Sequence, residues 1–271
     1  MISLSQCMQE ESMAIMEAAK KLNNKDVDKI IDLLDESFKN KKKILLTGVG
    51  KSGIVARKLA ATFTSIGLTA IYLNPLDALH GDLGIVDKND LCFLISNSGE
   101  TNELIQLLPH LRNKGSIQIG ILGKKDSNLW NFSDISLDAG VDKEVCPLNL
   151  APTASTTVAM AIGDALAVVW MEKSGVSIND FAVNHPSGRL GRKLTLRVSD
   201  LMKKSDEFKF LLEDASFLEI ITELTRGGMG LCCIKRKFNE KELSGLITDG
   251  DLRRTLRKYP PNDWEFLIAK A

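Results

Sequence analysis

Short apolar runs alternate with longer amphipathic stretches through the first 140 residues of the chain. The apolar runs, typical of buried strands, lie at 44–47, 69–73, 90–96, 116–122 and 135–138. Helical periodicity occupies residues 5–22, 26–40, 53–66, 101–113 and 127–132. Strands that alternate with helices predict a parallel sheet with right-handed crossovers and helices on both faces. The expected fold class is therefore α/β, with a doubly wound parallel sheet.

The pattern changes twice after this alternating region. A polar loop at 145–152 leads into a long alanine-rich helix at 153–173, and a second polar loop covers 181–194. From about Val198 an amphipathic helix and two strand patterns, the second running into a helix, indicate a compact α+β unit. We therefore expect two domains, at 1–195 and 196–271.

The first candidate for chemistry is a glycine-rich turn, Gly48-Val49-Gly50-Lys51-Ser52-Gly53, directly after the 44–47 strand pattern. A turn of this kind between a strand and a helix presents backbone N–H groups to an anion, so it predicts a ligand with a phosphate. Leu45 stands where a Walker A loop needs glycine, which argues against a nucleotide triphosphatase. The G-x-G-x-x-G spacing fits a dinucleotide site, but residues 71–75 lack the acid that would bind the ribose.

A second candidate, Ser96-Asn97-Ser98-Gly99-Glu100-Thr101, lies between the next strand pattern and a helix with a leucine stripe. Its three hydroxyls and backbone N–H groups suit a phosphate monoester better than a dinucleotide. An ordinary helix cap is the alternative interpretation, because Asn97 and Glu100 have the spacing of a capping box. Both candidates fall at the carboxyl ends of strands, where sheets of this class bind ligands.

Composition excludes several classes of protein. Lys+Arg and Asp+Glu both number 35, so no basic excess indicates nucleic-acid binding. The N-terminus lacks the pattern of a signal peptide, and the apolar stretch 158–171 is interrupted by Asp164 and too short to span a bilayer. The 5 cysteines include no C-x-x-C pair and are expected to be reduced thiols. We therefore expect a cytoplasmic protein without a membrane partner.

Five strings carry a resemblance to a known family. They are Gly48-Val49-Gly50-Lys51-Ser52-Gly53, His80-Gly81-Asp82-Leu83-Gly84, Ser96-Asn97-Ser98-Gly99-Glu100, Cys146-Pro147-Leu148 leading to Ala151-Pro152-Thr153, and His185-Pro186-Ser187-Gly188 leading to Leu190-Gly191. Together they resemble a sugar isomerase (SIS) domain, and more narrowly the arabinose-5-phosphate isomerase family. The later string 245–254 resembles a CBS motif, with Thr248 and Asp251 at the positions that often contact the ribose of an adenosine ligand.

The resemblance implies the fold, the activity and the assembly. It implies an SIS-type sheet followed by a CBS unit, and interconversion of D-ribulose 5-phosphate and D-arabinose 5-phosphate through an enediol, feeding Kdo and lipopolysaccharide biosynthesis. It also implies a homotetramer whose active site is built from more than one subunit, and a nucleotide effector at the CBS region. CBS motifs normally occur in pairs, so a second repeat is expected to be missing or truncated. Ser187 stands where many relatives have glycine.

Isomerisation needs a base on carbon, an acid at the carbonyl oxygen and a clamp on the phosphate. We expect His80 and His185 to handle ring opening and proton transfer between oxygens, since imidazole titrates near neutral pH. The resemblance places active-site glutamates at Glu103 and Glu144, and either could take the C2 proton. Lys51 would stabilise the enediolate. The expected phosphate-binding residues are Gly50, Ser52, Ser96, Asn97, Ser98 and Thr101.

Other interpretations of these residues remain open. Without the resemblance, His80 fits a loop hydrogen bond, His185 a turn and Glu103 a solvated helix face. The chemistry requires no cofactor and no metal, although an incidental ion could gather at His80 and His185. The alternatives for function are a sugar-phosphate sensor without catalysis, an isomerase for a hexulose or glucosamine phosphate, and a regulatory CBS module. A sensor usually carries a basic DNA-binding helix, and the N-terminal helical pair here is neutral.

Overall fold

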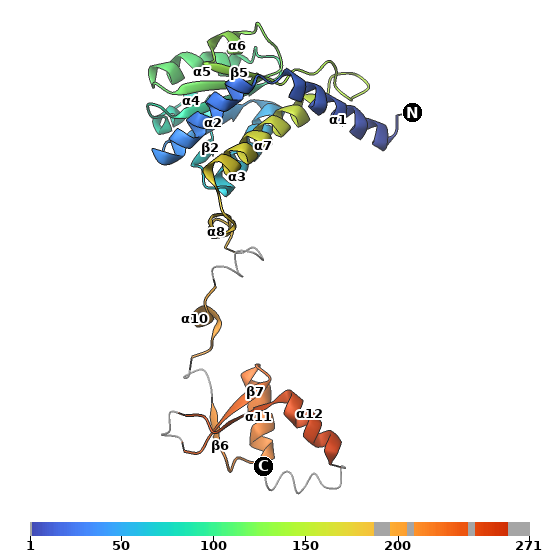
Figure 1. Cartoon of the computed structure of the whole chain (residues 1–271), viewed down its shortest axis with the longest axis vertical. Coiled ribbons are helices and arrows are strands. Elements are labelled where there is room, and N and C mark those ends of the chain that lie inside the picture. The colour runs from blue at the N-terminus through green and yellow to red at the C-terminus, as the bar shows by residue number, and fades with distance from the viewer. Residues whose placement is uncertain (1, 187–195, 205–208, 238–241, 260–271) are drawn as a thin grey trace. The chain divides into compact units, whose positions relative to one another are not determined.

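A computed structural model describes residues 2–186, 196–204, 209–237 and 242–259 (Figure 1). The chain divides into two compact units, Met1–Thr195 and Leu196–Ala271, and each unit is described by itself. The predicted residues Ser187, Gly188, Leu190 and Gly191, and the tail from Pro260 to Ala271, lie outside the described residues.

Five parallel strands form the sheet of the first unit. They are β1 (Ile44–Gly48), β2 (Ala70–Tyr72), β3 (Leu91–Ser96), β4 (Ile117–Leu122) and β5 (Ile135–Asp138), in the order β2-β1-β3-β4-β5. β1 and β3 are buried along their whole length, which explains their continuous apolar runs. The winding reverses between β1 and β3, which makes their carboxyl ends the switch point where such sheets bind ligands. The predicted doubly wound α/β sheet is confirmed.

Helices cover both faces of this sheet. One face packs against α1 (Leu4–Lys21), α2 (Asn24–Lys39), α3 (Gly50–Ser65) and α7 (Ala154–Ser174). The other face packs against α4 (Pro75–Leu79), the 3₁₀ turn η1 (Asp82–Ile85), α5 (Asn102–Asn113) and α6 (Asn128–Phe132). Alternate strand residues serve the two cores: Phe93 packs into the first and Leu94 into the second. Among the described residues of this unit, α8 follows α7 and covers Ile178–Val183.

α7 is the central helix of the first core. Gly163 permits close packing, because a Cβ at that position would lie 2.3 Å from Leu59 Cδ1 of α3. By length and composition α7 could cross a membrane, with 21 residues and a mean hydropathy of 1.5 over its most apolar window. The expectation that the apolar stretch 158–171 is too short to span a bilayer was therefore wrong, because the helix that contains it is 21 residues long. Half of that window is buried inside the unit, as in the core helix of a soluble protein.

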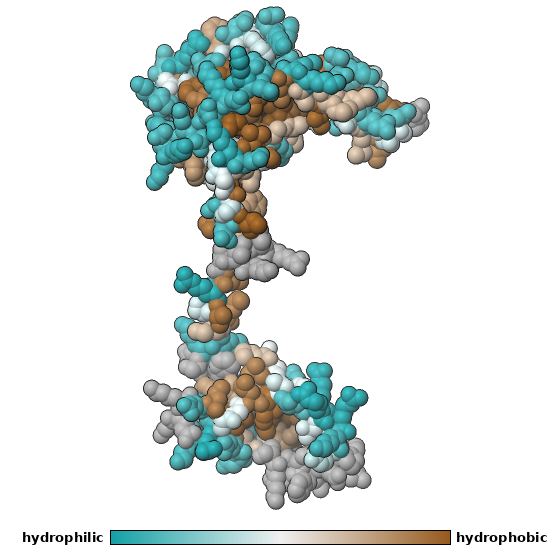
Figure 2. Space-filling view, viewed as in Figure 1, coloured by the Kyte–Doolittle hydropathy of each residue, from teal (hydrophilic) through white to brown (hydrophobic). Residues whose placement is uncertain are grey.

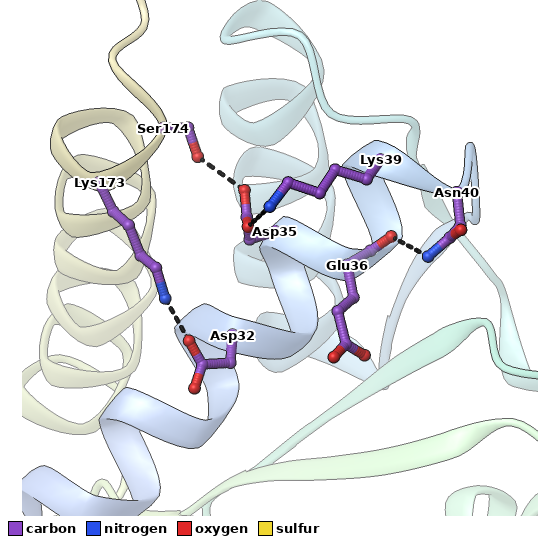
Figure 3. A network of polar contacts seen from close by, with 7 residues as sticks. All are labelled: Asp32, Asp35, Glu36, Lys39, Asn40, Lys173 and Ser174. Carbon is purple, nitrogen blue, oxygen red and sulfur yellow. Dashed lines mark hydrogen bonds and ion pairs between the residues drawn. The ribbon is translucent and has the colours of Figure 1, made fainter.

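Polar contacts join the carboxyl end of α7 to α2 (Figure 3). Lys173 pairs with Asp32, and Ser174 Oγ donates to Asp35 Oδ1 at 3.3 Å. A second ion pair joins Lys39 Nζ to Asp35 Oδ2 at 2.6 Å. The hydrogen bond within this pair holds the pKa of the Asp35 carboxyl below its usual value. The network lies at the opposite end of α7 from its first turn.

The second unit is a small α+β fold. It contains α10 (Val198–Leu201), β6 (Phe210–Leu212), α11 (Phe217–Gly227), β7 (Leu231–Lys235), β8 (Gly245–Thr248) and α12 (Asp249–Lys258). β7 pairs parallel with β6 and antiparallel with β8. Leu211, Ile220, Leu224, Cys232 and Ile234 form its core. This small fold agrees with the α+β unit expected after residue 196.

Candidate functional site

A cavity of about 160 Å³ lies at the carboxyl ends of β1, β3, β4 and β5. Its polar lining comes from the first turn of α3, the residues after β3 and the first turn of α7. The lining residues are Val49, Lys51, Ser52, Val55, Ile95, Ser96, Asn97, Ile121, Gly123, Ala139, Pro152, Ser155, Thr156 and Ala159. The glycine-rich turn and the serine loop therefore meet at one cavity, at the switch point of the sheet.

Close packing of strand on helix shapes the glycine-rich turn. A Cβ on Gly53 would lie 2.7 Å from the Gly48 carbonyl oxygen, so only glycine lets α3 begin this near β1. Gly50 has a φ of +59°, a conformation that favours glycine. The turn brings Lys51 and Ser52 to the cavity, while Gly50 itself lines a neighbouring cavity.

The buried residue Ser96 holds the serine loop through hydrogen bonds. Its side chain is 3% exposed, and its Oγ lies 2.9 Å from Thr101 Oγ1 and accepts from Gly99 N at 3.0 Å. Ser98 is exposed, and its Oγ accepts from Glu100 N at 3.2 Å. Ser98 and Thr101 lie outside the lining of the cavity. Ser96 therefore fixes the shape of a loop whose open side faces the cavity.

The alternative interpretation of this loop as a capping box is wrong. The N-cap of α5 is Thr101, and the Glu100 carboxylate reaches α6 instead. It accepts from Asn128 N at 2.9 Å and from Asn128 Nδ2 at 2.6 Å, and these bonds lower the pKa of Glu100.

The first turn of α7 forms another wall, with Ser155 and Thr156 at the cavity. Neither was predicted as a site residue, although three hydroxyl residues in a first helical turn after a proline were visible in the sequence. Glu144 caps this turn. Its carboxylate accepts from the backbone N–H groups of Thr153 and Ser155 and from both of their hydroxyls. Burial raises the pKa of Glu144, but the hydrogen bonds from Ser155 and Thr153 outweigh it and the pKa is lowered.

The two predicted histidines lie outside this lining. His80 is the exposed C-cap residue of α4, a short helix where only a loop was expected. His185 follows α8, and its Nδ1 donates to the Phe181 carbonyl oxygen at 2.8 Å. Glu103 is half-buried in the first turn of α5 and also lies outside the lining. Of the residues predicted for the site, the structure brings Lys51, Ser52, Ser96 and Asn97 to one cavity.

No cluster of three or more metal-ligating side chains is present among the described residues. The same residues include all 5 cysteines as free thiols. Burial raises the pKa of the Cys92 thiol in β3 to about 12, which makes it inert at neutral pH.

In the second unit, Thr248 and Asp251 bond to each other. Thr248 Oγ1 donates to Asp251 Oδ2 at 2.6 Å, and Asp251 N donates back to Thr248 Oγ1 at 3.2 Å, a capping box at the start of α12. Arg254 Nη2 lies 2.5 Å from Asp251 Oδ1. The bonds from Thr248 and then Arg254 lower the pKa of Asp251 to about 2.

Comparison with known proteins agrees with this geometry. Residues 37–169 match the SIS domain family. The arabinose 5-phosphate isomerase KpsF of Escherichia coli is 41% identical over 256 residues, which cover 94% of this chain and 76% of KpsF. The chain belongs to the arabinose 5-phosphate isomerase family. KdsD of Pseudomonas aeruginosa is 42% identical over 216 residues, 80% of this chain and 66% of KdsD, so the match spans about two thirds of that relative.

Solved structures share the fold of the first unit. An Escherichia coli CFT073 protein solved in complex with arabinose 5-phosphate superposes with a TM-score of 0.62 at 39% identity, over 66% of this chain and 93% of that chain. A sugar-phosphate isomerase structure from Listeria monocytogenes gives a TM-score of 0.65 at 36% identity, over 68% of this chain and 95% of that chain. The resemblance seen in the five sequence strings is thereby confirmed.

Proposed function

We propose that the chain interconverts D-ribulose 5-phosphate and D-arabinose 5-phosphate, the step that supplies the precursor of Kdo for lipopolysaccharide. The observation that carries this proposal is the kinship with KpsF, 41% identical over 94% of this chain. The cavity agrees with it, because a lysine, several hydroxyls and two helix starts converge where a small anionic sugar would bind.

The phosphate is held by the glycine-rich turn and the serine loop. Lys51 contributes a positive charge, and Ser52 and Asn97 contribute hydrogen-bond donors from the lining. Ser96 and Thr101 keep the loop in place through their shared hydrogen bond, so that its backbone N–H groups can bind the anion, and Ser98 would join them if its exposed side chain turns toward the ligand. Gly50 allows the backbone to turn toward the ligand. Lys51 also stabilises the charge of the enediolate.

The proton transfers fall to His80, His185 and a carboxylate. Because Phe181 O can only accept, the His185 Nδ1 carries the proton of this bond and the Nε2 of the neutral ring is a proton acceptor. An imidazole fixed in this tautomer suits ring opening and proton transfer between sugar oxygens. Only protons move in this scheme, so it needs no cofactor, and an ion at His80 and His185 would be incidental.

The catalytic histidines come from a neighbouring subunit of a homotetramer. The lining of the cavity, as far as the structure describes it, contains no histidine and no carboxylate, yet isomerisation requires proton transfer. Apolar side chains stand exposed on α1 and α7, and Figure 2 shows apolar residues gathered over these helices. They include Met8, Met13, Met16, Val168 and Val169. Assembly through this surface would bury them.

The second unit is a CBS motif on this proposal, and the boundary between the two domains falls near residue 195. Thr248 and Asp251 would contact the ribose of a nucleotide effector once the ligand competes with their capping box. The isomerase acts in the cytoplasm, where soluble sugar phosphates are available.

The test is turnover by the purified chain. D-ribulose 5-phosphate with chelator present should give D-arabinose 5-phosphate, and His80→Ala should lose this activity by about 10²–10⁴-fold. A hexulose phosphate and glucosamine phosphate serve as competing substrates. A silent protein whose melting temperature rises with arabinose 5-phosphate would be a sensor, and turnover of a hexulose phosphate alone would contradict the proposed substrate.

A further inference from the structure

The carboxylate of Glu144 accepts four hydrogen bonds. Oε2 accepts from Thr153 N at 2.8 Å, from Thr153 Oγ1 at 3.0 Å and from Ser155 N at 3.2 Å, while Oε1 accepts from Ser155 Oγ. All four donors belong to the start of α7. A carboxylate offers about four lone-pair sites, and these four bonds already engage both of its oxygens.

The four hydrogen bonds to Glu144 cap α7, a helix whose own N-cap residue makes no side-chain capping bond. The N-cap residue of α7 is Thr153, and its side chain makes no capping bond within the helix. Helix starts leave backbone N–H groups unsatisfied and carry a positive partial charge, which an ionised carboxylate complements. Glu144, nine positions earlier in the chain, therefore performs the task that a local cap usually performs.

The same bonds join the 144–153 loop to the wall of the cavity. Glu144 N donates to Asn149 Oδ1 at 2.7 Å, and Val145 N donates to Thr153 Oγ1 at 3.0 Å. Ser155, whose hydroxyl and N–H are both held by Glu144, lines the cavity beside Thr156. A shift of the Glu144 carboxylate would move Ser155 and the wall with it.

From these contacts we propose that Glu144 is a positioning residue, which fixes Ser155 and Thr156 as one wall of the sugar site, and that it does not remove the C2 proton. The inference rests on the proposed isomerase function. Because an ionised carboxylate already occupies the start of α7, a phosphate dianion binds on the opposite side of the cavity, at Lys51 and the serine loop. The wall of Ser155 and Thr156 then faces the hydroxyl-bearing carbons of the sugar. Glu103 remains as the candidate base.

The test compares Glu144→Gln, Glu144→Ala and Glu103→Gln in steady-state kinetics across pH. A glutamine keeps one acceptor oxygen, so Glu144→Gln should lose about 10–100-fold in kcat/KM, mainly through a higher KM, and Glu144→Ala should lose more. The loss of kcat/KM at acid pH should persist in Glu144→Gln and disappear in Glu103→Gln. If Glu144→Gln instead loses its activity through kcat and loses this acid limb, Glu144 is the base and the proposal is overturned.

A double-mutant cycle with Ser155→Ala adds a readout that general instability would not produce. Because Glu144→Gln and Ser155→Ala disrupt the same contact, their effects on KM should be less than additive. Full additivity would overturn the proposal, as would a lower melting temperature with an unchanged KM. Glu172→Gln, exposed near the other end of α7, is the matched control and should behave as wild type.

The failure of the proposed function would be seen separately. If the wild type turns over no sugar phosphate, the isomerase proposal fails. The positioning role of Glu144 can then still be tested by ligand binding. Arabinose 5-phosphate should raise the melting temperature of the wild type, and this rise should be smaller in Glu144→Gln. An equal rise in the wild type and Glu144→Gln would overturn the positioning role.

Discussion

The His185 ring is held twice by Phe181, the residue four positions before it. Its Nδ1 donates to the Phe181 carbonyl oxygen at 2.8 Å, and the two rings stack with centroids 4.0 Å apart. These contacts fix both the orientation and the tautomer of the imidazole. A ring held in this way presents Nε2 as its reactive nitrogen.

We predict that His185→Asn loses activity while it keeps its fold. The asparagine Nδ2 can replace the Nδ1 donor to Phe181 O, but no group replaces Nε2. The rate should fall by about 10²–10⁴-fold with little change in melting temperature. His110→Asn, on the exposed face of α5, is the control and should retain wild-type activity. A loss below about threefold in His185→Asn would exclude His185 from proton transfer.

A site shared between subunits predicts complementation. Lys51→Ala and His80→Ala should each be inactive, because one removes the cavity lysine and the other the donated histidine. Co-expressed with different affinity tags and purified as mixed oligomers, they should regain activity in about a quarter of their sites, the share formed by random pairing. Mixed oligomers that stay inactive would place both residues in a site within one chain.

Loss of the Ser96 hydroxyl should weaken phosphate binding. Ser96→Ala removes the partner of Thr101 Oγ1 and of Gly99 N, so the serine loop loses its internal support. The free energy of unfolding should fall by about 1 kcal/mol, and the KM for arabinose 5-phosphate should rise. Denaturant melts and initial rates check the two effects. Ser174→Ala, at the far end of α7, should leave the KM unchanged.

Gly123→Ala should displace Asn97 from the cavity. A Cβ at Gly123 would lie 2.2 Å from Asn97 Oδ1 and 2.5 Å from the Asn97 carbonyl oxygen, so the Asn97 loop must move. A displacement of this kind at a site can cost about 10²-fold in kcat/KM. Gly227→Ala is the control, since its new Cβ would meet nothing nearer than Glu223 Oε1 at 4.0 Å. Wild-type kinetics in Gly123→Ala would show that Asn97 does not contact the sugar phosphate.

Asp251 should make the stability of the second unit depend on pH. Its folded-state pKa of about 2 lies below the unfolded value, so the ionised carboxylate stabilises the unit above the unfolded pKa. This contribution to the free energy of unfolding should be lost as the pH falls from about 4 toward 2. Asp251→Asn should not show this pH-dependent loss, because it has no carboxylate to protonate. Melting curves of the two proteins over this range check the prediction. Parallel curves would show that the Asp251 bonds contribute nothing.

The parts of the fold that the sequence predicted are those that bury long segments. β1, β3 and β4 lie between two helical layers, so their apolar runs are continuous, and α5 shows its leucine stripe because one face is buried. α4 and α8 were missed, since helices of 5 and 6 residues show little periodicity, although α6 was predicted with only 5 residues. β6, with only 3 residues, was also missed.

The candidate site was predictable where local sequence determines it. The two loops were expected to meet because parallel strands end at one edge of a sheet, and Lys51, Ser52, Ser96 and Asn97 do line one cavity. The α7 wall was missed because its cap, Glu144, lies far outside the local spacing of a capping box. On the proposed function His80 and His185 reach the substrate across a contact between subunits, which no local pattern encodes.

The most direct measurement of the central claim is proton NMR of the purified chain with D-ribulose 5-phosphate in deuterated water. An enediol mechanism protonates C2 from a base that exchanges with solvent, so the account predicts D-arabinose 5-phosphate carrying deuterium at C2. The same experiment with Lys51→Ala should show almost no product. A wild-type protein that forms no arabinose 5-phosphate would contradict the account.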